Sequence, residues 1–204
     1  MNTTSQDAIV LLKADHQEAK ELFDKYENIK EHAGDDQKME IAKKVCGALL
    51  IHMEIEEKIF YPRVRQKIDD ADLMNEALVE HDGAKSLIQQ IGELKPGDPM
   101  FDAKIKVLGE QIEHHVEEEE KEMFPKARDS GLDLIELGSQ LFEAKNRLRV
   151  EHGLPALSTT PPTKTDTDSA PETTQAQVKA EKFSTKHSDE KFEFPKGQDA
   201  REIR

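Results

Sequence analysis

Residues 51–62 (IHMEIEEKIFYP) decide the fold, because a related stretch recurs at residues 114–125 (HHVEEEEKEMFP). Alignment on the final prolines pairs the histidine and glutamate of one copy with those of the other: His52 with His115, and Glu56 with Glu119. Each copy spaces them i, i+4, which places both side chains on one helix face. The duplication therefore predicts two helices that present histidine and carboxylate to a shared centre.

The surrounding sequence has the periodicity of helices, with apolar residues recurring every three or four positions. Breakers at residues 34–36, 95–99 and 130–131 separate the periodic segments. Pro62 is expected to kink or end the second helix. Four long helices with short connections favour an all-α, antiparallel up-down-up-down four-helix bundle. We expect helices over about residues 5–30, 37–66, 70–94 and 100–129, followed by a short fifth helix over 132–149.

The first two helices resemble the next two. The offset is 63 from His52 to His115, and 65 from His16 to His81. This two-fold repeat of a helical hairpin predicts a site with pseudo-two-fold symmetry.

The chain divides into two regions by composition. Residues 1–153 form the expected bundle domain, whereas residues 154–204 are rich in Thr, Pro, Lys, Glu and Ser. Such a segment buries too little apolar area to offset its ordering entropy, so we expect a disordered C-terminal tail. Whether the tail phenylalanines dock a protein partner or have no specific role is left open: Phe183, Phe192 and Phe194.

Charge and cysteine content exclude several classes of function. The net charge of -14 and the pI of about 5.0 argue against nucleic acid or an anionic membrane as the main partner. The single cysteine, Cys46, rules out a disulfide within the chain and is expected to be buried. Without a signal-peptide pattern or membrane span, the expected location is the cytoplasm. The sequence leaves monomer and dimer open.

Four histidines and two glutamates occupy the apolar stripes: His16, His52, Glu56, His81, His115 and Glu119. Burying them unpaired would cost more than a fold can tolerate, so mutual pairing or cations are required. Imidazole and carboxylate suit iron, manganese or zinc. Six ligands exceed the needs of one tetrahedral zinc and suit two metals bridged by the glutamates. Open positions would accept oxo, hydroxo, water, dioxygen or peroxide.

These motifs resemble the hemerythrin-like HHE cation-binding domain over about residues 5–150. The resemblance implies a four-helix bundle holding two non-heme iron ions, with an oxo or hydroxo bridge. Manganese and zinc are the alternative metals. It also implies that the protein binds, senses or reacts with dioxygen, peroxide or nitric oxide. The six residues above would be the metal ligands.

One position departs from oxygen-carrying members of that family, because Lys85 occupies the place of a fifth histidine. His114, Tyr26 and Tyr61 are the candidates to replace it, although helix geometry turns His114 away and the tyrosines are expected to pack the bundle ends. Around the ligands, Glu57 and Glu120 are expected to hydrogen-bond histidines. For the acids that precede His16 and His81, Asp15 and Glu80, a hydrogen bond to a ligand histidine is left open, although helix geometry points them away by about 100°.

Three functions fit these observations. The first is a diiron protein that binds or reacts with a small diatomic molecule or peroxide. The second is a metal-storage or metal-sensing module without turnover, which signals through its tail. The third is a purely structural bundle in which histidines pair with glutamates. The sequence does not decide whether the protein is an enzyme.

Overall fold

The computed structural model describes residues 6–157, and every regular element in that part of the chain is helical. Two of the elements, η1 and η2, are single π turns. The elements are α1 (Ala8–Ile29), α2 (Asp35–Ile55), η1 (Glu56–Phe60), α3 (Tyr61–Arg65), α4 (Ala71–Gly92), α5 (Pro99–Glu118), η2 (Glu119–Met123), α6 (Phe124–Asp129) and α7 (Leu134–Glu151).

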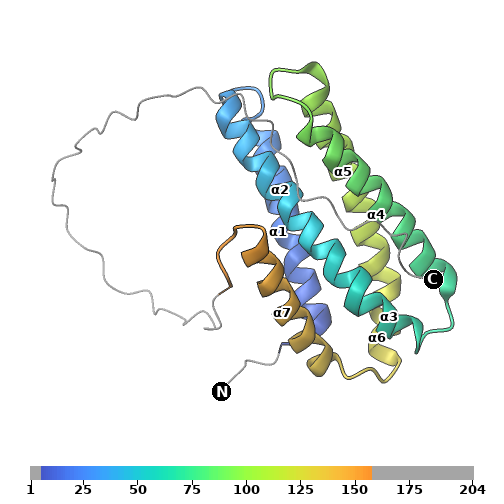
Figure 1. Ribbon diagram of the computed structural model, residues 1–204. Helices are drawn as coiled ribbons and strands as arrows, with labels where there is room; N and C mark the ends of the chain where they lie inside the picture. Colours follow the sequence, from blue (N-terminus) through green and yellow to red (C-terminus); the bar gives the residue numbers. More distant parts are fainter. Residues whose placement is uncertain (1–5, 158–204) are drawn as a thin grey trace, which may run out of the picture.

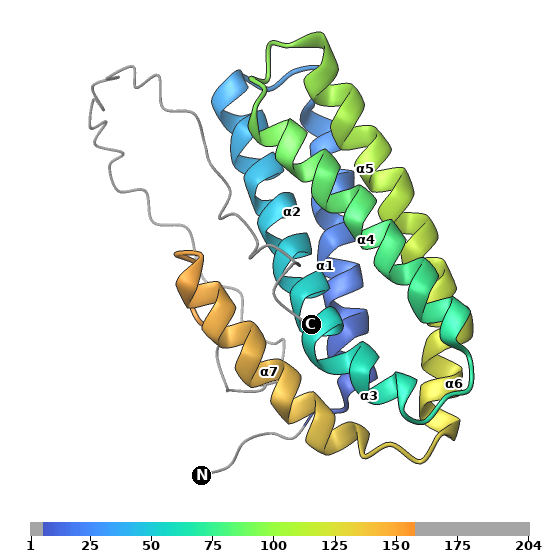
Figure 2. The ribbon, with the colours of Figure 1, turned by 45° about the vertical axis from the view of Figure 1, so that its right-hand side comes forward.

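Four long helices form the predicted bundle (Figure 1). The second consists of α2, η1 and α3 in direct succession, and the fourth consists of α5, η2 and α6. Helix α1 packs on α2 and α4 packs on α5, so each hairpin is a unit. The fifth helix, α7, lies outside the bundle against α1 and α2 (Figure 2). The predicted all-α bundle with a short fifth helix is confirmed.

Aspartates begin most of the helices. The side chain of Asp7 accepts hydrogen bonds from the backbone of Ile9 and Val10, and Asp70 caps α4 in the same way. These carboxylates satisfy amide donors that have no partner inside the helix. Asp98 and Asp133 start α5 and α7 by the same device. The helix starts therefore follow from local chemistry.

A π turn precedes the proline of each repeated motif. Pro62 and Pro125 have no amide hydrogen, and their rings would collide with the carbonyl four residues earlier. The backbone instead bonds over five residues, from Tyr61 N–H to the Glu56 carbonyl. The second copy does the same from the residue after η2 to Glu119. The helix continues past each proline with one residue inserted, a local form typical of functional sites.

The core has two parts, separated along the bundle by a layer of polar side chains. One part gathers large apolar residues near α3, α6 and α7, including Phe60 and Phe124. The other lies toward the opposite end, around Tyr26, Leu49 and Phe101. The layer between them holds the buried histidines and glutamates of the repeated motifs. Apolar packing on both sides therefore fixes the helices that carry this layer.

Helix α7 approaches the start of α1 closely at Gly138. A β-carbon there would lie 1.8 Å from the backbone oxygen of Gln6, so this contact requires glycine. Within residues 6–157, none of the helices combines the length and apolar character needed to cross a bilayer. The predicted tail role of Phe183, Phe192 and Phe194 falls outside the described residues, and the domain boundary at residue 153 stays a prediction.

Candidate metal centre

All six predicted ligands meet in the polar layer. His16 comes from α1, His81 from α4, and the other four from the two repeated motifs. Each of the six is at most 6% exposed. Their inward-facing atoms are close to one another: His16 Nε2 lies 3.2 Å from Glu119 Oε2, and His52 Nε2 lies 3.2 Å from Glu56 Oε2. On the other side, the Nε2 atoms of His81 and His115 are 3.0 Å apart.

The donors form two overlapping groups. One group contains His16, His52, Glu56 and Glu119, and the other contains Glu56, His81 and His115. Within each group, one ligand atom per residue lies within 4.8 Å of the others. Glu56 belongs to both groups, while Glu119 also lies 3.6 Å from His115 Nε2. Two neighbouring cations that share the glutamates fit this arrangement.

Four buried polar atoms in this layer lack a hydrogen-bond partner within the described part of the chain: His16 Nε2, His52 Nε2, Glu56 Oε1 and Glu119 Oε2. Leaving a buried polar atom unpaired costs about 1–3 kcal/mol. Unpaired groups of this kind are rare in folded proteins and need an explanation. All four are imidazole or carboxylate atoms that point into one centre, so the residues present fit metal ions.

The outward nitrogen of every histidine faces a carboxylate. His16 Nδ1 lies 3.0 Å from Glu120, and His81 Nδ1 lies 2.8 Å from Glu57. An ionised carboxylate only accepts, so Nδ1 carries the proton and Nε2 offers its lone pair to the centre. The same holds for the remaining pairs, His52 with Asp15 at 3.4 Å and His115 with Glu80 at 2.8 Å.

Lysines hold three of these four carboxylates. Lys13 lies 2.8 Å from Glu120, and Lys85 lies 2.6 Å from Glu57. Asp15 pairs with Lys145, which comes from α7. The fourth carboxylate, Glu80, has the exposed ring of His114 at 3.8 Å. Positive charge therefore lies next to three of the four carboxylates.

Burial and neighbouring charge shift the pKa values within the layer. Burial, with Glu119 close by, raises the pKa of Glu56 well above its usual value. Burial would also raise the pKa of Glu119, but His115 and His16 outweigh it and bring it to about 2. Burial lowers the pKa of His52 to about 4 despite the hydrogen bond with Asp15. A neutral His52 is the form that can bind a metal.

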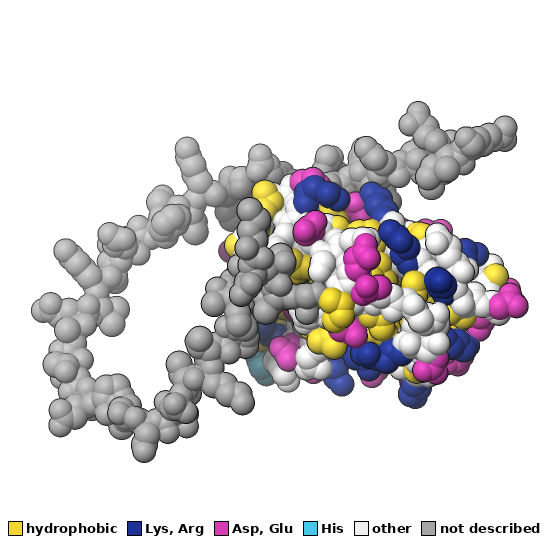
Figure 3. Space-filling view, turned by 90° about the horizontal axis from the view of Figure 1, so that it is seen from below, with side chains coloured by type: hydrophobic (Ala, Val, Ile, Leu, Met, Phe, Trp, Pro, Cys, Tyr) yellow, Lys and Arg dark blue, Asp and Glu magenta, His cyan; other side chains and the backbone are white. Residues whose placement is uncertain are grey.

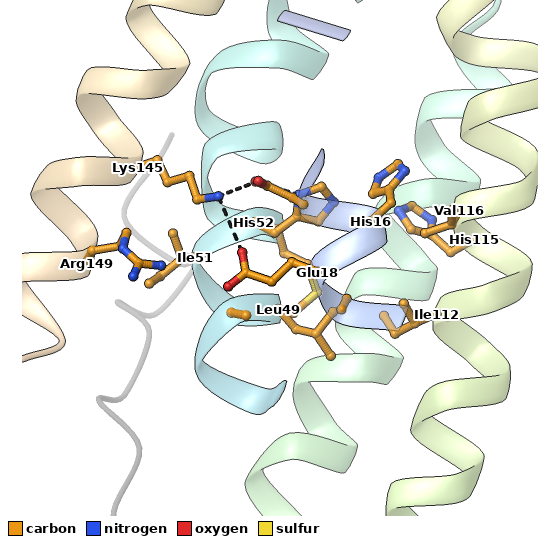
Figure 4. A pocket seen from close by; sticks show the side chains of 14 residues that line it. His16, Glu18, Leu49, Ile51, His52, Ile112, His115, Val116, Lys145 and Arg149 are labelled. Carbon is orange, nitrogen blue, oxygen red and sulfur yellow. Dashed lines mark hydrogen bonds and ion pairs between the residues drawn. The ribbon is translucent and has the colours of Figure 1, made fainter. Parts of the chain in front are cut away.

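A small hollow adjoins the centre between α1, α2, α5 and α7. Its volume is about 20 Å³, and it is lined by His16, His52 and His115 together with apolar side chains such as Leu49 and Ile112. Figure 4 shows these residues with Lys145 and Arg149 reaching toward them from α7. The space suffices for about one water-sized molecule.

Comparison with known proteins agrees with this geometry. Residues 7–127 match the model of the hemerythrin HHE cation-binding domain. The chain belongs to this family. A crystal structure of a hemerythrin HHE cation-binding domain-containing protein from Mycobacterium kansasii has the same fold, with a TM-score of 0.62 and 21% identity. That similarity covers 72% of this chain and 90% of the other.

A curated relative of this HHE domain is longer. It is a DNA nickase from Nostoc sp., 29% identical over 121 residues. These residues are 59% of this chain and 33% of the relative. The chain thus spans about a third of the length of that protein. The helix α7 lies after the residues that match the family model.

One expectation about the HHE centre was wrong. Tyr61 was expected at a bundle end, but its hydroxyl lies 2.9 Å from Glu119 and 3.3 Å from His81 Nε2. The π turn causes this, because five residues of α-helix would have turned Tyr61 about 140° away from Glu56. Asp15 and Glu80 do point away from their own neighbours, as helix geometry requires. They reach histidines on the adjacent helices, so the contact with a ligand histidine that the sequence left open is present.

The structure also shows where the remaining candidate residues lie. His114 is 63% exposed and pairs with Glu118 and Glu80, away from the centre. Tyr26 lies in the core part around Leu49 and Phe101, and its hydroxyl donates a hydrogen bond to Asp102. Lys85 replaces the expected fifth histidine without entering the centre, since its amino group binds Glu57. The predicted contacts of Glu57 and Glu120 with histidines are confirmed.

Sequence reasoning missed Lys145 altogether. No spacing or motif links α7 to the repeated hairpins. The roles of Asp15 and Glu80 did leave a signal, because an acid precedes a histidine at the same place in both halves of the repeat.

Proposed function

We propose that this HHE domain binds two iron ions and that it binds, senses or reacts with a small oxygen species or nitric oxide. The observation that carries the proposal is the set of imidazole and carboxylate atoms that point into one buried centre without a hydrogen-bond partner in the described part of the chain. His16 and His52 would hold one ion, His81 and His115 the other, and the glutamates 56 and 119 would bridge them. Imidazole and carboxylate ligands also accept manganese or zinc.

Bound iron would supply the redox chemistry that the side chains themselves lack. The chain contributes orientation, because each carboxylate at Nδ1 turns a histidine Nε2 inward. It also limits access. The hollow beside His16 and His52 has room for a molecule of about the size of water. These features favour a diatomic molecule or peroxide over a larger substrate.

Tyr61 adds a proton donor. Burial, followed by the charges of Glu119 and Glu56, raises the pKa of its phenol well above the usual value. The hydroxyl therefore keeps its proton and donates it in a hydrogen bond to Glu119. A donor placed beside a ligand carboxylate can steady that carboxylate or a small molecule bound next to it.

A metal-storage or metal-sensing role without turnover is the alternative, and the same centre would serve it. DNA cleavage, suggested by the name of the Nostoc relative, is less favoured. A net charge of -14 opposes the phosphate backbone. On the face in Figure 3, acidic and basic side chains are mixed and form no cationic patch.

Elemental analysis of the purified full chain, with absorption spectra in air and after anaerobic reduction, tests the proposal. We expect about two irons per chain and a near-ultraviolet band that bleaches on reduction. His115→Ala should lose metal, whereas His114→Ala should not, because that neighbouring ring is exposed. Redox-silent metal in the native chain would favour storage or sensing. Absence of bound metal, with no rise in melting temperature on adding iron, manganese or zinc, would refute the proposal.

A further inference from the structure

Lys145 joins the fifth helix to the polar layer of the bundle. Its amino group pairs with one oxygen of Asp15 and lies 4.0 Å from Glu18. The other oxygen of Asp15 faces His52 Nδ1 at 3.4 Å. Figure 4 shows the Lys145 side chain extending from α7 toward His52 and Glu18. One continuous series of polar contacts thus links α7 to a predicted metal ligand.

Asp15 differs from the other three carboxylates at the histidines. Glu120, Glu57 and Glu80 have side chains that are 32%, 23% and 21% exposed, so water can solvate their charge. The side chain of Asp15 is only 7% exposed, because α7 covers it. A buried carboxylate without a partner is costly, so its position depends on a buried cation. Lys145, 10% exposed, is that cation.

The residue that matches Asp15 in the internal repeat, Glu80, has different surroundings, so the support by a buried lysine belongs to the Asp15 half of the centre. Glu80 occupies the place of Asp15 in the second hairpin, whereas α7 packs mainly on α1 and α2 of the first. Its neighbour at 3.8 Å is the exposed ring of His114. Glu80 nevertheless holds His115 at 2.8 Å, a shorter contact than Asp15 makes with His52. The Asp15 side therefore has the weaker direct contact and the stronger need for support.

We propose that Lys145 is a positioning residue of the metal centre. Through Asp15 it holds His52 with the proton on Nδ1 and the Nε2 lone pair toward the centre. This makes α7, which lies outside the residues that match the family, a working part of the metal-binding unit. The inference rests on the proposed function in that it takes His52 to be a ligand.

Three variants of the full chain separate positioning from simple packing. Lys145→Met removes the charge and keeps the length of the side chain. Lys145→Arg keeps the charge. The matched control is Arg147→Met on the same helix, because Arg147 is 68% exposed and pairs with Glu151 one turn away. If Lys145→Met does not fold, Lys145→Gln takes its place.

The first readout needs no metal. Nitrogen-15 spectra of histidine-labelled, metal-free protein report which ring nitrogen of His52 carries the proton, with His52→Gln to assign the signal. We expect the Nδ1–H form in the native chain, in Lys145→Arg and in Arg147→Met. In Lys145→Met we expect a mixture of both forms, because the acceptor at Nδ1 is no longer held in place.

The second readout is the affinity for ferrous iron and for zinc, measured anaerobically against a chelator. Lys145→Met should bind about 10–100-fold more weakly, the usual loss for a group that orients a ligand. The control should bind like the native chain. A Lys145→Met protein that melts earlier but keeps the His52 proton form and the affinity would overturn the inference. If the native chain binds no metal, the proposed function fails, and the proton form of His52 still decides the role of Lys145.

Discussion

The hydroxyl of Tyr61 lies 2.9 Å from a carboxylate oxygen of Glu119, across the pseudo-two-fold axis of the bundle. The residue that matches it in the second motif, Phe124, has no hydroxyl and stacks on His16 with ring centres 5.6 Å apart. The two halves of the centre are therefore unequal. One half has a proton donor beside the ligands and the other has an apolar ring.

Replacing Tyr61 with Phe should lower the stability of the metal-free chain and weaken its binding of iron. Without the hydroxyl, Glu119 loses a donor in a buried site, which should cost the metal-free chain about 1–3 kcal/mol in urea unfolding. Tyr26→Phe is the matched control, because its hydroxyl binds Asp102 far from the ligands. The control should lower stability without changing affinity for iron. Equal affinities for the native chain and Tyr61→Phe would show that this hydroxyl does not act on the centre.

Glu56→Gln should separate stability from metal binding. Glu56 is fully buried beside Glu119, and burial together with this neighbouring charge raises the pKa of Glu56, so without a cation the neutral side chain is favoured. We expect metal-free Glu56→Gln to be no less stable than the native chain. Its affinity for metal should fall by more than about 100-fold, because removing a direct ligand lowers the affinity more than removing a residue that only orients one. Glu54→Gln, on the outer face of the same helix, should change neither affinity nor fold. A chelator competition assay measures the affinity.

Gly138→Ala should loosen α7. The added methyl group would lie 1.8 Å from the backbone oxygen of Gln6, so the helix or the N-terminal segment must move. We expect a loss of about 1–3 kcal/mol, together with weaker protection of α7 amides in hydrogen exchange. Gly83→Ala is the control, because its nearest neighbour would be 3.8 Å away. That change should stabilise the chain by up to about 1 kcal/mol. Equal stability of both variants would contradict the close approach.

Asp70→Asn should weaken the fold at neutral pH but not at acid pH. Lys126 at 2.8 Å and the amide of Leu73 hold the pKa of Asp70 below its usual range. A lowered pKa stabilises the fold above the unfolded value near 3.8, and this contribution is lost as pH falls through the folded pKa. Urea melts at pH 7 and below pH 3 should show a difference that shrinks in acid. Asp69→Asn, which removes a negative charge from the neighbouring residue, is the matched control.

Cys46 should resist thiol reagents in the folded chain. It is 1% exposed, and burial raises the pKa of its thiol to about 12. Only the thiolate attacks, so at pH 8 the native protein should react at its rate of opening. Added urea should increase the labelling rate over the range of concentrations in which the protein unfolds. Rapid labelling of native protein by a disulfide reagent would show that the part of the core around Cys46 is open to solvent.

Much of this protein follows from its sequence. The repeated His and Glu at i, i+4 placed His52, Glu56, His115 and Glu119 on inward faces, and periodicity added His16 and His81. These inferences succeed because the α-helix has a constant rotation per residue, which local spacing reports directly. The breaker segments at residues 34–36, 95–99 and 130–131 lie at or beside helix boundaries for a similarly local reason.

The tertiary structure decided what lies around those ligands. A π turn, set by the backbone next to Pro62, brought Tyr61 into the centre against the α-helical expectation. Asp15 and Glu80 face away from their own helical neighbours yet meet histidines of other helices. Lys145 arrives from a helix with no repeat partner. Contacts of this kind depend on how helices rotate and pack against each other. Spacing along one helix carries the direction of a side chain, but not the identity of the group that it meets.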